Sequence, residues 1–93
     1  MNKEVEKIMP IKCPSCSQLL EVARLICPAC QTAVEGNFRL SILSKLSQED
    51  QEFIVEFMKA SGSLKDMAQS YGISYPTIRN RLDTVIEKLK LLL

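Results

Sequence analysis

Residues 13–30 read CPSCSQLLEVARLICPAC, with one Cys-Pro-x-Cys motif at each end. These two motifs contain the four cysteines of the 93-residue chain. Each motif can form a tight loop that points two thiolates at one spot, and two such loops supply the sulfurs of a tetrahedral zinc site. Ten residues separate the motifs, enough for a short hairpin that returns the second loop to the first. The pattern therefore predicts a Zn²⁺ ion bound by Cys13, Cys16, Cys27 and Cys30.

Other uses of cysteine fit this pattern less well. A thioredoxin-like redox site uses a single Cys-x-x-Cys in a βαβ unit, which surrounds neither motif here. A disulfide framework needs a secretory context, and the N-terminal MNKEVEKIM lacks the apolar segment of a signal peptide. An iron–sulfur cluster also takes four cysteines, but two short symmetric loops suit a single small ion better. Because four thiolates close the coordination shell and the chain has no histidine, we expect structural zinc and no enzymatic activity.

The overall composition is that of a globular protein with one small domain or two very small modules. Apolar residues make up 46% of the chain, charged residues 25%, and the net charge is +1. Because this bulk charge is so weak, a nucleic-acid surface has to come from local placement of basic residues. No apolar run approaches the ~20 residues of a membrane span, so we expect no membrane association. Cysteines held as zinc thiolates without a signal peptide indicate a cytoplasmic protein.

The residue pattern divides the chain into four parts. They are a flexible lead-in (1–10), a four-cysteine zinc ribbon (11–37), a bridging segment (38–46) and a helical domain with a long C-terminal helix (47–93). Short β-prone runs at 19–22, 24–26 and 32–35 predict the strands of the ribbon. The bridging segment is expected to begin extended and to end in a helical turn.

Capping motifs mark the helices of the C-terminal part. Ser47-x-x-Asp50 and Ser63-x-x-Asp66 each place a hydroxyl at the N-cap and an acid in the first turn, which predicts two helix starts. Gly72 is suited to the left-handed position that ends the second of these helices. A third helix is expected over 75–90, where apolar residues recur with a period of about 3.6.

The short second helix, a glycine-containing turn and a longer third helix are typical of a helix-turn-helix. Residues 64–82, LKDMAQSYGISYPTIRNRL, resemble sigma-factor region 4 and the output domains of LuxR-type response regulators. From Cys13 to Leu89 the chain resembles a small bacterial family of unknown function that pairs a zinc ribbon with this helix-turn-helix. The resemblance implies an α+β fold, a small zinc ribbon followed by about three helices, and a role in transcriptional regulation. Zinc ribbons usually have glycine after each second cysteine, whereas this chain has Ser17 and Gln31, which predicts some backbone strain there.

Polar side chains on the third helix and its surroundings are candidates for contact with double-stranded DNA. Asn and Arg are suited to base edges in the major groove, and Ser, Thr and Lys to phosphates. The candidates are Lys65, Ser74, Tyr75, Thr77, Arg79, Asn80 and Arg81. The alternative interpretation of this helix surface is a solvated face with incidental arginines.

The third helix also carries more apolar residues than a small core requires, at near-heptad spacing. These are Val85, Ile86, Leu89, Leu92 and Leu93. Two interpretations remain open: the stripe packs on the zinc ribbon of its own chain, or it forms the seam of a homodimer. In either case the favoured function is a DNA-binding transcriptional regulator. The alternative is a protein-binding adaptor that acts on RNA polymerase or another regulator, and neither function involves a small-molecule substrate.

Overall fold

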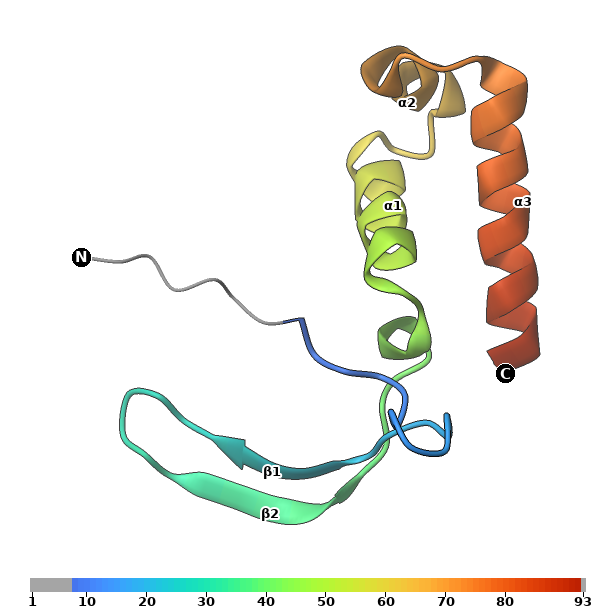
Figure 1. Cartoon of the computed structure of the whole chain (residues 1–93). Coiled ribbons are helices and arrows are strands. Elements are labelled where there is room, and N and C mark those ends of the chain that lie inside the picture. Colours follow the sequence, from blue (N-terminus) through green and yellow to red (C-terminus); the bar gives the residue numbers. More distant parts are fainter. Residues whose placement is uncertain (1–7, 93) are drawn as a thin grey trace. The chain divides into compact units, whose positions relative to one another are not determined.

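The computed structural model describes residues 8–92, so most of the lead-in predicted over 1–10, and Leu93, lie outside the described residues. The chain divides into two compact units, Met1–Ser41 and Ile42–Leu93. A two-stranded antiparallel sheet occupies the first unit and three α-helices the second (Figure 1). This element order confirms the predicted α+β fold class, a zinc ribbon followed by a helical domain.

The sheet of the first unit is a hairpin of β1 (Val22–Ile26) and β2 (Ala33–Phe38). Its pairing starts with Ile26 opposite Ala33 and ends with Val22 opposite Phe38, with a bulge between Val22 and Arg24. The second cysteine motif forms the tip of this hairpin. The first motif precedes β1 in a smaller loop that is closed by an isolated antiparallel bridge between residues 12 and 19.

The ten residues between the cysteine motifs do not form a hairpin, so that prediction is wrong. Their second half, from Val22 on, is the single strand β1, which pairs forward in the chain with β2. The apolar residues of the first unit stay in contact with solvent: Leu25, Ile26 and Val34 are half exposed. None of residues 8–41 is buried. This unit therefore has no fully buried apolar residue to stabilise it.

Helix-capping residues define the second unit as the sequence predicts. After a 3₁₀ turn, η1 (Leu43–Lys45), helix α1 spans Gln48–Lys59, α2 Leu64–Tyr71 and α3 Tyr75–Leu92. The Ser47 hydroxyl accepts the backbone N–H of Asp50 at 3.2 Å, and the Ser63 hydroxyl accepts that of Asp66 at 3.2 Å. Gly72 ends α2 in the left-handed conformation, with φ 68° and ψ 33°. Each predicted cap is thus confirmed by a hydrogen bond or a backbone angle.

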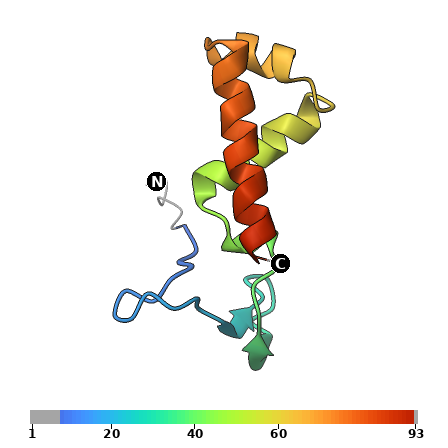
Figure 2. The ribbon, with the colours of Figure 1, turned by 90° about the vertical axis from the view of Figure 1, so that its right-hand side faces the viewer.

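The core of the second unit lies between α3 and the pair formed by α1 and α2. Both shorter helices lie on the same side of α3 (Figures 1 and 2). The buried apolar residues are Leu46, Phe53, Leu64, Met67, Ala68, Ile78 and Val85. Leu82, Leu89 and Leu92 are partly buried against this cluster.

Most of the C-terminal stripe that was predicted to face a partner or the ribbon belongs to this core. Val85 is only 1% exposed and is a core residue, which corrects its assignment to a dimer seam. Its position follows from the helix period, because Val85 lies two turns after Ile78 and so faces the same core. Ile86 is partly buried and Leu91 is 85% exposed. Within residues 8–92, no helix combines the length and apolar character needed to cross a membrane.

Candidate metal centre and nucleic-acid interface

The two cysteine loops have the same backbone geometry. In the first, the N–H of Ser17 donates to the carbonyl of Cys13 at 2.9 Å; in the second, Gln31 donates to Cys27 at 2.8 Å. Ser17 and Gln31 adopt left-handed conformations, with φ of 63° and 66°. These are the two positions where zinc ribbons usually have glycine, so the predicted backbone strain is present and falls on residues with a Cβ.

One sulfur in each loop has a hydrogen-bonding group close to it. The backbone N–H of Ser15 donates to Sγ of Cys13 at 3.4 Å, and the hydroxyl of Thr32 lies 3.0 Å from Sγ of Cys30. The pKa of Cys13 is lowered, first by the backbone N–H of Cys16, then by that of Ser15 and by the Cys16 thiol. The pKa of Cys30 is lowered as well, first by the Thr32 hydroxyl. Because metals bind the thiolate, both loops favour the binding form of cysteine.

Each loop fits one half of a tetrahedral thiolate site, but the two halves lie apart in this structure. Among residues 8–92, no three metal-binding side chains gather at one point. The separation follows from the hairpin: the second loop is at its tip, the first precedes its other end, and the five residues of β1 lie between. A strand of that length spans about 16 Å. The residues that could hold zinc are therefore present as two preformed pairs.

A tight connection joins α2 to α3 in the second unit. The N–H of Ile73 donates to the carbonyl of Ala68 at 3.0 Å, which completes the glycine C-cap. Ser74 then caps α3, because its hydroxyl accepts the N–H of Thr77 at 3.3 Å. The buried side chains of Ala68 and Ile78 lie in the common core of the two helices. This is the geometry of a helix-turn-helix, in which a short helix supports a longer one.

Six of the seven predicted DNA-contact residues are exposed. Lys65 lies on α2, Ser74 caps α3, and Tyr75, Thr77, Arg79 and Asn80 lie in the first two turns of α3. Arg81 differs, because it is partly buried and its guanidinium is engaged within the unit. Its Nη2 lies 3.3 Å from Oδ1 of Asp50, and its Cζ lies 5.3 Å from the centre of the Phe53 ring. The structure thus gives Arg81 a role in joining α3 to α1.

Asp50 is the buried centre of a partly exposed ionic cluster that sequence reasoning missed. Its side chain is only 5% exposed and accepts Nζ of Lys88 at 2.7 Å in addition to Arg81. Burial raises the pKa of Asp50, but hydrogen bonding and charge from Lys88, the Ser47 hydroxyl and the charge of Arg81 outweigh it, so the net shift is downward. The sequence showed Asp50 only as a helix-capping acid, and no local signal links it to residues more than 30 positions away.

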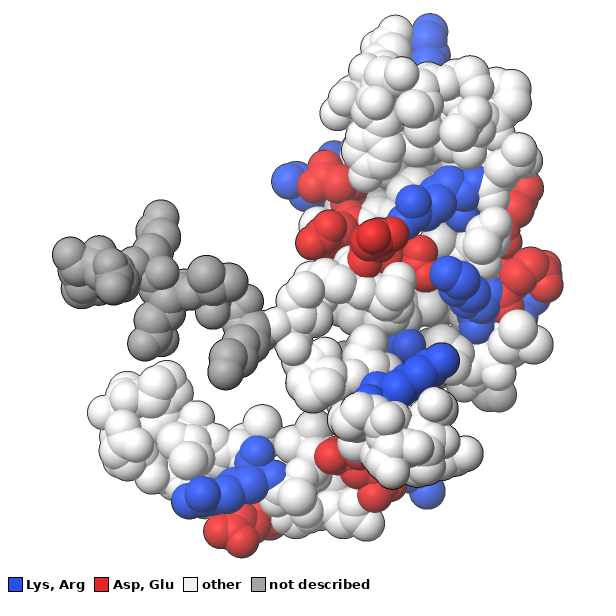
Figure 3. All heavy atoms as spheres, viewed as in Figure 1, with Lys and Arg blue, Asp and Glu red and all other residues white. Residues whose placement is uncertain are grey.

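The remaining charges of α3 are paired along the helix. Arg79 lies 3.5 Å from Asp83, and Lys90 lies 3.6 Å from Glu87. On the face of the helical unit visible in Figure 3, basic and acidic side chains alternate and no continuous basic patch forms. Contact with phosphates would therefore depend on a few positions rather than on a general positive field.

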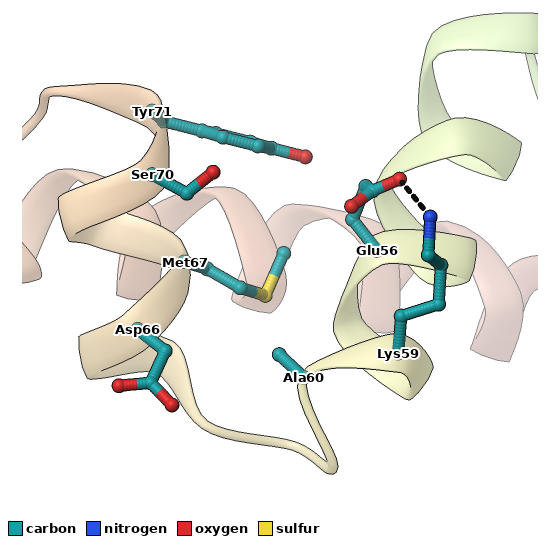
Figure 4. Close-up of a pocket in the computed structure, with 7 residues that line it drawn as sticks. All are labelled: Glu56, Lys59, Ala60, Asp66, Met67, Ser70 and Tyr71. Atoms are coloured by element: carbon teal, nitrogen blue, oxygen red, sulfur yellow. Dashed lines mark hydrogen bonds and ion pairs between the residues drawn. The ribbon is translucent and has the colours of Figure 1, made fainter.

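A shallow hollow of about 210 Å³ lies between α1 and α2. Figure 4 shows Met67, Ser70 and Tyr71 of α2 on one side of it and Ala60, the C-cap residue of α1, on the other. Glu56 also borders the hollow, but its carboxylate is paired with Lys59 at 3.4 Å. The lining mixes apolar and charged groups without a buried polar side chain that points into the hollow.

Both units of the chain match models of one protein family. Residues 13–44 match the DUF2089 zinc ribbon, and residues 46–92 match the helix-turn-helix of the domain of unknown function DUF2089. No curated protein and no solved structure matches the chain. The two matched segments agree with the resemblance drawn from the sequence and with the order of elements in the structure. The chain therefore belongs to the DUF2089 family, in which a zinc ribbon precedes a helix-turn-helix.

Proposed function

We propose that this protein is a DNA-binding transcriptional regulator that contacts duplex DNA with α3. The observation that carries the proposal is the α2–α3 connection, in which Gly72 and Ser74 fix a short supporting helix against a long one. The first two turns of α3 remain exposed and polar, as a helix that enters the major groove requires. Lys65 on α2 is exposed and has no ion-pair partner among residues 8–92, which leaves it available to a phosphate.

Zinc has a structural role in this proposal. The first unit has no buried residue over 8–41, so a bound ion is its available source of folding free energy. A single ion held by Cys13, Cys16, Cys27 and Cys30 requires the two loops to come together. The four thiolates would then close the coordination shell and leave no position for a substrate. We expect one zinc per chain by elemental analysis of protein purified without added metal. Less than half an equivalent, with free thiols or disulfides, would contradict a site made of four cysteines.

Salt-dependent binding to duplex DNA tests the main proposal. We expect the affinity for mixed-sequence duplexes to fall with rising salt, as phosphate contacts require. Lys65→Ala should weaken binding to all sequences alike and reduce the salt slope by about one unit. The matched control is Lys59→Ala, which removes the same charge from α1, where it is paired with Glu56. If Lys65→Ala binds like the parent, Lys65 does not contact a phosphate. If the parent binds no duplex, neither α2 nor α3 is a DNA surface.

The apolar surface of the first unit favours a second candidate function, a protein-binding adaptor. Leu25 is 55%, Ile26 50% and Val34 51% exposed on the β1–β2 hairpin. Exposed apolar groups in one small unit are typical of protein-contact surfaces, and RNA polymerase or another regulator is the class of partner expected here. An adaptor of this kind would bind its partner without a salt-dependent affinity for DNA, so the experiment above separates the two functions.

A further inference from the structure

Within the first ten residues of α3, one face carries three uncharged polar side chains. At about 100° per residue, Thr77, Asn80 and Thr84 fall within roughly 60° of one another on the helix. All three are exposed. The buried residues Ile78 and Val85 lie about 80–160° from these three residues around the helix, in the core. Of the side chains on this face, only Asn80 has an amide, and that amide has no hydrogen-bond partner within residues 8–92.

The hydroxyls of the two threonines on this face are already hydrogen-bonded. The hydroxyl of Thr77 is bonded to the Ser74 hydroxyl at 2.8 Å. The hydroxyl of Thr84 donates to the backbone carbonyl of Asn80 at 3.0 Å. Both hydroxyls thus have a partner within the helix or its cap, and the γ-methyl groups are the apolar part that these threonines can add to a contact.

The side chains that read guanine are held elsewhere. Arg81 is bound to the buried Asp50 and stacks on Phe53, so its release would remove one of the links between α3 and α1. Arg79 forms a weaker, exposed ion pair with Asp83. Arg79 does not belong to the face of Thr77, Asn80 and Thr84, because it points in another direction around the helix. It lies about 100° from Asn80 and about 160° from Thr77 around the helix. Arg79 instead neutralises Asp83, whose carboxylate would otherwise repel phosphates beside this face.

We infer that the face of Thr77, Asn80 and Thr84 recognises adenine–thymine base pairs in the major groove. An asparagine amide matches the N6 donor and N7 acceptor of adenine, and a threonine methyl makes apolar contact with the thymine methyl. Guanine and cytosine are matched instead by arginine or lysine and by carboxylates. This inference rests on the proposed DNA-binding function and names the base pairs that the same surface reads.

A selection of random duplexes by the full-length zinc-loaded protein, followed by binding of base analogues, tests the inference. We expect an enriched motif with consecutive A·T pairs at its centre. In that motif, 7-deazaadenine, which lacks the N7 acceptor, should lower the affinity about tenfold at the position read by Asn80. Uracil in place of the contacted thymine should lower it about threefold, because one methyl contact is lost.

Variants of the face assign each effect to a side chain. Asn80→Ala should bind 7-deazaadenine and adenine duplexes equally. Thr77→Ser removes the methyl and keeps the hydroxyl, so it should lose the discrimination against uracil, whereas Thr77→Val should retain it. Glu52→Gln, which changes an exposed carboxylate on α1 in the same way, is the matched control and should keep both preferences.

The possible failures are distinguishable. Absence of any duplex binding would overturn the proposed function and the inference with it. Binding with an enriched motif centred on G·C pairs, or retention of 7-deazaadenine sensitivity by Asn80→Ala, would overturn the inference alone. Equal uracil discrimination by Thr77→Ser and Thr77→Val would refute the role of the methyl group.

Discussion

Replacement of Asp50 by Asn is expected to destabilise the helical unit by about 2 kcal/mol at neutral pH. The carboxylate accepts two charge-assisted hydrogen bonds, from Lys88 at 2.7 Å and from Arg81 at 3.3 Å. Bonds of this kind contribute about 1.5–3 kcal/mol when well formed, and the longer one counts for less. The side chains of Lys88 and Arg81 are 49% and 40% exposed, so both can turn to water in the variant. The larger penalty for a stranded buried charge, about 3–5 kcal/mol, therefore does not apply.

Denaturant unfolding monitored by the helical circular dichroism signal measures this change, and Asp66→Asn is a matched control. Asp66 occupies the same position in its own capping motif, with its N–H bonded to Ser63 at 3.2 Å, as that of Asp50 is to Ser47. It is exposed, however, and makes no ion pair within the described part of the chain. Asp66→Asn should lose only the interaction with the helix dipole, about 0.3–1 kcal/mol.

The pH dependence gives a second, independent check. The pKa of Asp50 lies below its ordinary value of 3.8. Burial raises this pKa, but the combined effect of Lys88, Ser47 and Arg81 is larger and lowers it. A carboxyl whose folded pKa lies below its unfolded pKa stabilises the fold above the unfolded value, and this stability is lost as the pH falls through the folded value. The difference between the parent and Asp50→Asn should therefore be constant near neutral pH and shrink below about pH 4. The ionic role of Asp50 would be refuted if Asp50→Asn and Asp66→Asn lowered the free energy of unfolding equally. It would also be refuted if the difference between the parent and Asp50→Asn persisted in strong acid.

Three further changes probe the core, the cysteine loops and the C-terminal stripe. Ile78→Ala should cost about 2–5 kcal/mol in denaturant unfolding, because Ile78 is 0% exposed in the core; a cost below about 1 kcal/mol would contradict that position. Ser17→Gly and Gln31→Gly should each tighten zinc in a chelator competition by about 0.5–1 kcal/mol, since both residues have positive φ; unchanged zinc affinity would show that the strain is absent from the metal-bound loops. Leu89→Lys with Leu92→Lys should unfold the helical unit, because both residues pack on the core; a folded, zinc-bound monomer would instead return these residues to a dimer seam.

Local capping signals made the helices predictable. Ser47 and Ser63 lie three residues before the N–H groups that they cap, and Gly72 ends α2 through its own backbone angles. Each interaction spans fewer than five positions, so the residue types alone specify it. The strain at Ser17 was predicted from the resemblance to zinc ribbons, which usually have glycine at this position, and its φ of 63° agrees.

Long-range pairings were not predictable in this way. The bond from Lys88 to Asp50 joins residues 38 positions apart, and that from Arg81 to Asp50 joins residues 31 apart. A sequence pattern records that Arg81 is basic, but not that a buried carboxylate lies opposite it. The same limit explains the error in the ribbon: a β-prone run of ten residues can fold on itself or extend, and strand register depends on partners that the run does not contain.

The chemistry of the α3 face sets how much specificity one chain can supply. A bidentate contact from Asn80 contributes about 1–3 kcal/mol of discrimination, and a methyl contact from Thr77 about 0.8 kcal/mol. Specific binding usually exceeds non-specific binding by about 4–10 kcal/mol, so one such face reaches at most the lower end of that range. A second reading surface is therefore needed. The apolar stripe of α3 was predicted to supply this second surface by pairing two chains. It is largely buried within its own chain, since Val85 is 1% exposed and Leu89 packs on the same core. If two copies bind one site, their contact has to use surface outside this core, and a dimer found by sedimentation should then separate into folded monomers rather than unfold.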